Sequence, residues 1–206
     1  MRKVVKLSVV LFSILMVTSV SAQNLSFGVK AGVNFSNMVA DGNSGDMKIG
    51  PVAGVTVDYG ITENLFLLTG LDLSVKGTKE SDYDYSLTYN PLYLQIPIHI
   101  AYKFSVVEAE NVKFVVEAGP YVAYGVAGKV KYKDDDGESD SSDLYGDLAP
   151  FKRFDFGVGA GIGLEVNKLK FSVGYDFGLA NINDMFGDED LKVNNRNFFI
   201  TVGYRF

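Results

Sequence analysis

The stretch that decides the fold is "NFFITVGYRF", residues 197–206. Its side chains alternate between two faces, and one face carries only apolar residues, namely Phe198, Ile200, Val202, Tyr204 and Phe206. This period of two predicts a β-strand with an aromatic face. An open strand edge offers unpaired backbone groups to other chains, so soluble proteins usually protect it. The stretch therefore favours a fold in which this strand has a neighbour on both sides.

The same alternation recurs in seven earlier segments, at 25–35, 51–59, 65–76, 91–104, 112–132, 153–166 and 169–180. Long polar connections (36–50, 77–90, 133–151 and 181–195) alternate with short turns (60–64, 105–111 and 167–168). Long loops on one side and short turns on the other are typical of outer-membrane barrels. The pattern predicts an all-β fold, an eight-stranded antiparallel transmembrane β-barrel of the up-and-down kind. In such a barrel the last strand pairs with the first, at 25–35, and has no free edge.

The first 22 residues have a different composition from the rest of the chain. They read as a basic segment ("MRKVVK"), an apolar run ("LSVVLFSILMV") and small residues ("TSVSA"). This order predicts a secretory signal peptide at 1–22, cleaved before Gln23. No later segment approaches 18 consecutive apolar residues, so a membrane-spanning helix is not expected after the signal. Residues 23–206 then form one barrel domain, exported to the cell outer membrane.

The polar face of the predicted strands indicates which face of the barrel is outside. It carries many glycines, which weaken a strand facing water but leave room inside a narrow barrel. It also carries charges of both signs, and buried charges need partners. We therefore predict an interior ion-pair network of Lys30, Asp58, Asp72, Lys76, Glu117, Lys129, Arg153, Asp155, Glu165 and Asp176, with Lys131 on the same face. A soluble lipocalin-like binding barrel, with its apolar face inside, stays as an alternative.

Aromatic residues gather near both ends of the apolar face. One group is Phe27, Tyr59, Tyr102, Phe104, Phe114, Phe171, Tyr204 and Phe206, and the other is Phe35, Tyr124, Tyr132, Phe154, Phe156, Phe177 and Phe198. Two aromatic girdles that flank an aliphatic band are typical of membrane barrels.

The composition excludes several kinds of chemistry. The chain has no Cys and one His, which excludes disulfides, thiolate metal sites and multi-His metal sites. Its formal net charge of −6 disfavours nucleic-acid binding. His99 is expected to be a hydrogen-bonded interior residue rather than a general base, so no enzymatic activity is predicted. No cofactor is predicted either.

Two motifs resemble ligand sites only superficially. The acidic stretch "KDDDGESDSSD" (133–143) would place Tyr132 at the first ligand position of an EF-hand, where tyrosine is no ligand. A looser carboxylate site at Asp134, Asp136 and Asp140 is a weak candidate for a divalent cation. The run "GVGAGIG" (157–163) lacks the Lys and Ser/Thr of a phosphate-binding loop, and its period of two predicts a thinned wall inside the barrel.

Several stretches together resemble a known family. These are "FGVKAGVNFSNM" (27–38), "PLYLQIPIHIAYKF" (91–104), "VEAGPYVAYG" (116–125), "FDFGVGAGIGLE" (154–165) and "GYRF" (203–206). They resemble the PorT-like outer-membrane β-barrel family of Bacteroidetes-type bacteria. The resemblance implies a small outer-membrane barrel, and some members of that family assist a secretion and gliding apparatus. The aromatic end, with Tyr204 and Phe206, also resembles the signal read by the outer-membrane insertion machinery.

The predicted role follows from these features. Eight strands leave a lumen filled by side chains rather than an open pore. We expect a structural or interaction role in the cell envelope, with acidic extracellular loops. The expected partners are outer-membrane lipid, the insertion machinery during assembly, and an envelope protein, but no nucleic acid. An accessory role in a secretion or gliding apparatus is the alternative function within the membrane.

Overall fold

The computed structural model of the chain describes residues 24–40, 43–81, 85–105, 111–134, 139–145, 151–183 and 191–206. The predicted signal peptide, 1–22, lies outside these ranges. Within them, no helix is long and apolar enough to cross a membrane.

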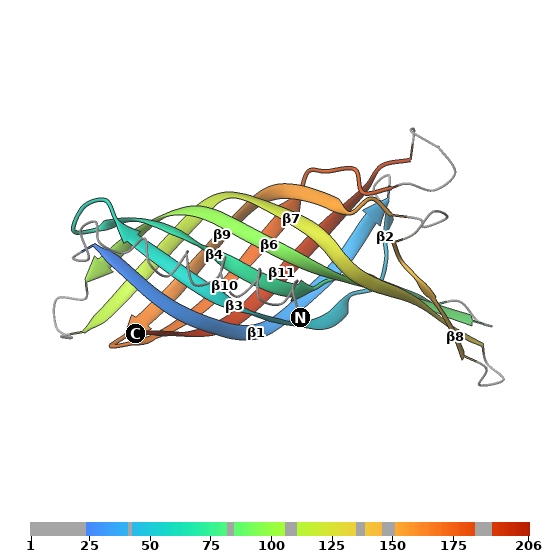
Figure 1. The fold of residues 1–206 in the computed structure, drawn as a ribbon, viewed down its shortest axis with the longest axis horizontal. Helices are drawn as coiled ribbons and strands as arrows, with labels where there is room; N and C mark the ends of the chain where they lie inside the picture. Colours follow the sequence, from blue (N-terminus) through green and yellow to red (C-terminus); the bar gives the residue numbers. More distant parts are fainter. Residues whose placement is uncertain are drawn as a thin grey trace, which may run out of the picture.

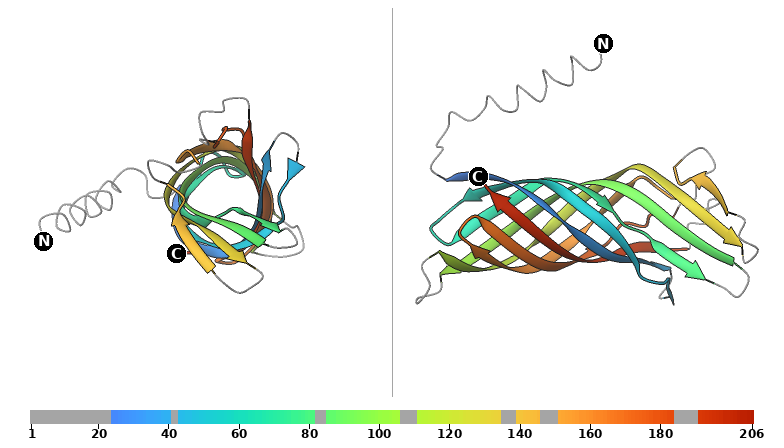
Figure 2. Two further views of the ribbon diagram at one scale, coloured as in Figure 1. Left: turned by 90° about the vertical axis from the view of Figure 1, so that its right-hand side faces the viewer. Right: turned by 90° about the horizontal axis from the view of Figure 1, so that it is seen from below.

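Eight long strands form a closed ring. They are β1 (Leu25–Ala40), β3 (Lys48–Gly60), β4 (Leu65–Val75), β6 (Tyr85–Ser105), β7 (Val112–Asp134), β9 (Phe154–Val166), β10 (Leu169–Gly178) and β11 (Val193–Arg205). Each strand pairs antiparallel with the long strands before and after it in the sequence, and β1 pairs with β11. The end-on view in Figure 2 shows the closed ring. The predicted up-and-down barrel is confirmed.

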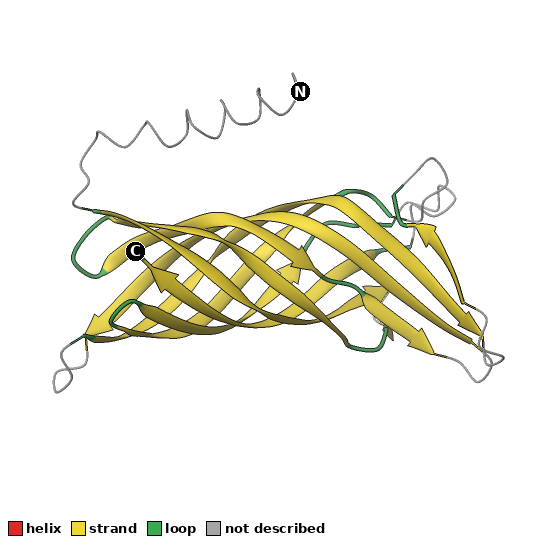
Figure 3. Ribbon diagram, turned by 60° about the horizontal axis from the view of Figure 1, so that its bottom comes forward, coloured by secondary structure: helices red, strands yellow, loops and turns green. Residues whose placement is uncertain are grey.

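The pairing of β1 with β11 explains the aromatic end of the chain. It runs from Gly28 opposite Arg205 to Ala40 opposite Val193. The Phe206 N–H then donates a hydrogen bond of 2.9 Å to the Phe27 carbonyl. The C-terminus and the start of β1 lie at the same end of the barrel (Figure 3). That end also carries the short turns at 61–64 and 167–168, and we call it the turn end; the opposite end is the loop end. Bacterial barrels place short turns in the periplasm.

Three short strands lie where the sequence predicted only loops. They are β2 (Asn43–Ser44), β5 (Thr78–Ser81) and β8 (Ser139–Asp143), so the sheet has eleven strands. β5 pairs with β6, and β8 pairs with β7. Together β5, β6, β7 and β8 extend beyond the ring at the loop end (Figure 1). The loop prediction for 36–50, 77–90 and 133–151 was wrong in these parts. The described side chains of these short strands are mostly exposed, apart from Thr78, and such strands do not need an apolar face.

The outer face of the barrel is apolar and exposed. Ile98 and Ile100, in the middle of β6, are 43% and 49% exposed. All eight aromatic side chains of the turn-end girdle are exposed, from Phe27 to Phe206. At the loop end Tyr124, Phe154, Phe156, Phe177 and Phe198 are exposed too. A contiguous apolar surface of this size suits lipid rather than water.

A β-bulge in β7 changes which residues face outward near the loop end. Tyr93 pairs with Gly125, but Leu92 pairs with Ala127, so Val126 is an extra residue. One extra residue exchanges the two faces of the strand beyond it. Gly128 and Val130 therefore continue the inner face. The lysines that alternate with them, Lys129 and Lys131, lie on the outer face. The predicted interior positions of these two lysines were wrong for this reason.

The bulge also moves Tyr132 out of the loop-end girdle. Tyr132 shares the face of Val130, and its ring stacks on that of Tyr85, with 6.0 Å between ring centroids. It therefore belongs to the sheet that extends beyond the ring.

Candidate functional site in the barrel lumen

Glycines on the inner faces of β7, β9 and β10 make room for large side chains. A Cβ on Gly159 would lie 3.0 Å from His99 Nε2, and one on Gly161 would lie 3.5 Å from Glu117. A Cβ on Gly174 would collide with the ring of Phe199. The glycine run at 157–163 therefore thins the wall of the lumen, as the sequence predicts.

The half of the lumen nearest the turn end encloses a polar cavity. The cavity has about 1040 Å³ of empty space, including its opening, and Asn167 and Lys168 of the turn between β9 and β10 line it. Charged side chains of both signs contribute to its wall, among them Lys30, Asp72, Glu117, Lys170 and Arg205. This cavity opens at the turn end, and side chains of the strands and of the turn line it.

Ion pairs cross the lumen between strands that are distant in sequence. Lys30 Nζ lies 2.8 Å from Asp72 Oδ2. Lys103 Nζ, fully buried, lies 3.0 Å from Asp58 Oδ2 and 2.7 Å from Glu165 Oε1. Each buried charge in these pairs has an opposite charge within hydrogen-bonding distance, which burial requires.

Further pairs join the remaining strands. Glu117 is held between Lys170, at 2.6 Å, and His99, whose Nδ1 lies 3.5 Å away. Arg205 Nη1 lies 3.5 Å from Glu165 Oε2. The structure thus brings together seven predicted residues, Lys30, Asp58, Asp72, Lys76, Glu117, Glu165 and Asp176.

Sequence reasoning missed Lys103, Lys170 and Arg205 as partners in this network. The available signal was their spacing along the strand. Lys103 lies four residues after His99, and Arg205 lies four residues after Thr201, so each shares the inner face of that residue. Alternation along a strand predicts which face a side chain lies on. Which charged side chains meet across the lumen depends on the tilt and stagger of the strands.

Three predicted members do not form ion pairs. Lys129 is exposed on the outer face and makes no ion pair with the described residues. Arg153 donates to the backbone carbonyls of Gly125 and Tyr145, at 2.9 and 3.3 Å. Asp155 is buried, but it accepts hydrogen bonds from Tyr121 and Asn195. Both donors reach Asp155 Oδ2, whereas the buried Oδ1 has no hydrogen-bond partner among the described residues. Asp155 makes no ion pair with the described residues, so the prediction of an ion pair there was wrong.

A layer of buried polar residues separates the cavity from the loop end. Lys76 is fully buried, and its Nζ lies 3.7 Å from Asp176 Oδ2. The same Nζ lies 4.6 Å from the ring centroid of Tyr121 and 5.8 Å from that of Tyr93. Both tyrosines are almost fully buried. Large aromatic rings and an ion pair thus fill the lumen at this level.

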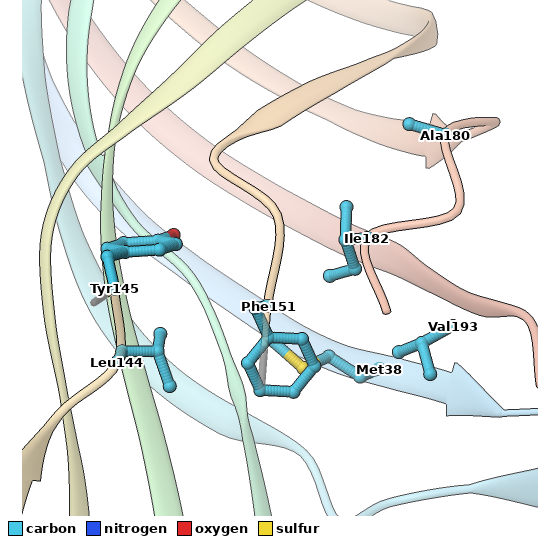
Figure 4. Packing of buried hydrophobic residues seen from close by; sticks show 7 residues of the cluster. All are labelled: Met38, Leu144, Tyr145, Phe151, Ala180, Ile182 and Val193. Carbon is cyan, nitrogen blue, oxygen red and sulfur yellow. The ribbon is translucent and has the colours of Figure 1, made fainter. Parts of the chain in front are cut away.

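Apolar side chains fill the loop end of the lumen. We call this cluster the plug; it consists of Met38, Leu144, Tyr145, Phe151, Ala180, Ile182 and Val193. Figure 4 shows how the segments at 144–145, 151 and 180–182 bring their side chains to the ends of β1 and β11. Burial raises the pKa of the Tyr145 phenol to about 12, and Arg153 lies 4.8 Å from its ring centroid. Tyr145 is therefore neutral at physiological pH, and the plug stays apolar.

Gly125 offers a test of how tightly the plug is packed. The three atoms nearest to a Cβ there all belong to the side chain of Tyr145, so Gly125→Ala is expected to lower the free energy of unfolding by about 1–3 kcal/mol through overpacking. Chemical unfolding in detergent micelles measures the loss. The losses of Gly125→Ala and Tyr145→Ser are expected to be less than additive in the double variant, because Tyr145→Ser removes the ring that the new methyl group would meet. Strictly additive losses in the double variant would show that the two residues do not touch.

The candidate cation ligands in the acidic stretch do not form a site among the described residues. Asp134 ends β7 and Asp140 lies exposed in β8, where it accepts a hydrogen bond from the Ser141 N–H. Asp136 lies outside the described residues. No group of three or more metal-ligating side chains occurs in the described part of the chain.

A closed ring with an apolar outer face and paired charges inside defines an integral β-barrel of the bacterial outer membrane. Comparison with known families agrees with this class. The sequence profile described as "Outer membrane protein beta-barrel domain" matches residues 21–184, and the chain belongs to this family. The protein is thus located in the cell outer membrane, and the soluble lipocalin-like alternative was wrong.

The comparison with solved structures found bacterial surface and outer-membrane proteins at low sequence identity. Ail of Yersinia pestis is 17% identical, with a TM-score of 0.46 over 89% of this chain and 100% of that one. Neisserial surface protein A is 14% identical, with a TM-score of 0.47 and the same coverage. OprG of Pseudomonas aeruginosa is 10% identical, with a TM-score of 0.42 over 88% and 95%. No protein with a curated description matches the sequence.

Proposed function

We propose that this protein is a structural and interaction barrel of the cell envelope rather than a channel. The plug is the observation that carries this proposal, because apolar side chains from five parts of the chain meet inside the mouth of the barrel. Between the plug and the turn-end cavity, the buried side chains around Lys76 and Tyr121 form a second barrier across the lumen. An ion that entered the turn-end cavity would meet both barriers.

Conductance in a planar lipid bilayer tests this proposal. The purified protein is expected to show no porin-sized steps, since eight-stranded barrels leave little room for water beyond their side chains. A sensitised variant, Tyr93→Ala with Tyr121→Ala, removes two buried rings next to Lys76 and is expected to leak only if the plug opens as well. Steady porin-like conductance in the unmodified protein would contradict the proposal.

We also propose that the protein is not an enzyme. His99 supports this view, because it is buried inside the lumen and faces Glu117 rather than an exposed rim. Ser172 lines the same cavity, but no hydrogen bond joins it to His99 among the described contacts. A hydrolase would need a nucleophile within hydrogen-bonding reach of its base.

Lipid, the insertion machinery and an envelope protein are the partners that we propose. The sheet of β5, β6, β7 and β8 supports the last of these, because it extends beyond the ring into the space outside the membrane. The resemblance to PorT-like barrels supports an accessory role in a secretion or gliding apparatus as the second candidate. Pull-down with the intact barrel, compared with a barrel that lacks residues 79–88 and 131–142, would separate a partner of the sheet from one that binds elsewhere.

A further inference from the structure

The β-bulge at Val126 creates a groove on the outer side of the loop end. Leu92 and Val126 line it together with Lys129, Lys131, Arg153 and Asp143, and Tyr145 of the plug closes its inner side. The groove has about 1020 Å³ of empty space, including open solvent. It lies where β7 leaves β9, since β7 pairs with β9 up to Tyr124 and with β8 from Lys129 onward.

The groove has an apolar part and a cationic part. Val126 is 43% exposed and, with Leu92, forms the apolar wall. Lys129, Lys131 and Arg153 supply three positive charges, whereas Asp143 is the one carboxylate in the lining. Such a surface fits an amphiphilic molecule with an anionic head.

The cations of the groove make no ion pair with the described residues, although Asp143 lies opposite Lys129 in the pairing of β7 with β8. Lys129 and Lys131 are exposed and make no ion pair with the described residues. The Arg153 guanidinium donates to two backbone carbonyls and makes no ion pair with the described residues. A phosphate group could accept hydrogen bonds from these cations without displacing an existing ion pair.

The position of the groove along the barrel places it at the boundary of the membrane. Tyr124, two residues before Val126, is 51% exposed and pairs with Phe154 of β9, which is 54% exposed. Both belong to the loop-end aromatic girdle, and such girdles lie at the level of the lipid headgroups. The apolar wall of the groove thus faces acyl chains, and the lysines reach up into the headgroup layer.

We propose that this groove binds the phosphorylated headgroup of a lipid in the outer leaflet. The phosphate lies between Lys129, Lys131 and Arg153, and an acyl chain packs against Leu92 and Val126. The bulge is essential to the site, because without it Lys129 and Lys131 would face the lumen.

Titration with a phosphatidic acid in phosphatidylcholine micelles tests the proposal. The variant Lys129→Gln/Lys131→Gln is expected to bind phosphatidic acid about tenfold or more weakly, since each lysine near an anionic lipid surface contributes on the order of 1 kcal/mol. The matched control is Lys79→Gln/Lys152→Gln, which removes the same charge from exposed lysines outside the groove. NMR shifts of backbone amides at 126–131 report occupancy of the groove.

Two further measurements distinguish a lipid phosphate from free inorganic phosphate as the ligand. Inorganic phosphate is expected to bind far more weakly than the lipid, and Leu92→Asn is expected to weaken binding of the lipid only. Saturation by inorganic phosphate at the same concentration as lipid would overturn the lipid assignment. Equal affinities of the groove variant and the control variant would overturn the site itself. Both variants change exposed side chains, and the gel mobility of the folded barrel before heating confirms that they assemble.

Discussion

Replacing Lys103 by methionine is expected to lower the free energy of unfolding by about 3–5 kcal/mol, the usual cost of leaving buried charges unpaired. Lys103 Nζ lies between Asp58 and Glu165, at 3.0 and 2.7 Å, and also 4.3 Å from the ring centroid of Phe66. Its side chain is only 1% exposed. Methionine keeps the length of the side chain but leaves two carboxylates without their cation. Arg205 reaches only the other oxygen of Glu165, at 3.5 Å, so it does not replace Lys103.

Urea unfolding of the protein in lipid vesicles measures this loss, with the heat-dependent gel mobility of the barrel as readout. The matched control is Lys168→Met in the exposed turn, which is expected to change the free energy by less than about 0.5 kcal/mol. A triple variant, Lys103→Met with Asp58→Asn and Glu165→Gln, is expected to recover part of the stability, because no unpaired charge remains. A Lys103→Met loss no larger than that of Lys168→Met would refute the role of the pair.

The ring and its inner face could be predicted from the sequence because a strand has a strict period of two. Once Phe198 and Phe206 are placed on the lipid face, Thr201 and Arg205 must face the lumen. The same parity placed Lys30 and Asp72 inside, where the structure pairs them at 2.8 Å. The alternation of side chains therefore predicts the strands and their inner and outer faces over most of the chain.

The rule of alternation assigns the wrong face to residues beyond a β-bulge, and the amino-acid sequence does not show where the bulge lies. In the segment "YGVAGKVKY" (124–132) nothing distinguishes Val126 as an extra residue. The extra residue becomes visible only in the pairing with β6, where Tyr93 meets Gly125 and Leu92 meets Ala127. Every side chain after it changes face. The misplacement of Lys129, Lys131 and Tyr132 therefore has one cause.

The plug could not be predicted either, for a different reason. Leu144, Tyr145 and Phe151 lie in a polar connection, where isolated apolar residues give no periodic signal. They acquire a role only because the closed ring offers an interior next to the ends of β1 and β11. Tertiary closure, rather than local pattern, decides that these residues are buried.

Deleting Phe206 is expected to reduce the amount of assembled barrel in the outer membrane far more than its contacts explain. The side chain is 70% exposed on the lipid face, and its ring centroid lies 5.7 Å from that of Tyr204. The deletion removes one backbone hydrogen bond, from the Phe206 N–H to the Phe27 carbonyl. Such a bond contributes about 1 kcal/mol, which alters abundance only several-fold.

The larger effect is expected because the aromatic end of β11 resembles the signal read by the insertion machinery. Assembly in cells, followed by the fraction of protein with folded mobility on a gel, gives the first measurement. Refolding of the purified, shortened chain into detergent micelles gives the second, and is expected to stay close to that of the full chain. Phe104→Ala is the matched control, since Phe104 is 50% exposed in the same turn-end girdle. If the deletion and Phe104→Ala impair assembly in cells equally, Phe206 acts as one more lipid-facing aromatic residue. If the deletion reduces assembly in cells but leaves refolding in micelles unchanged, Phe206 acts in recognition by the insertion machinery, before β1 and β11 close the barrel.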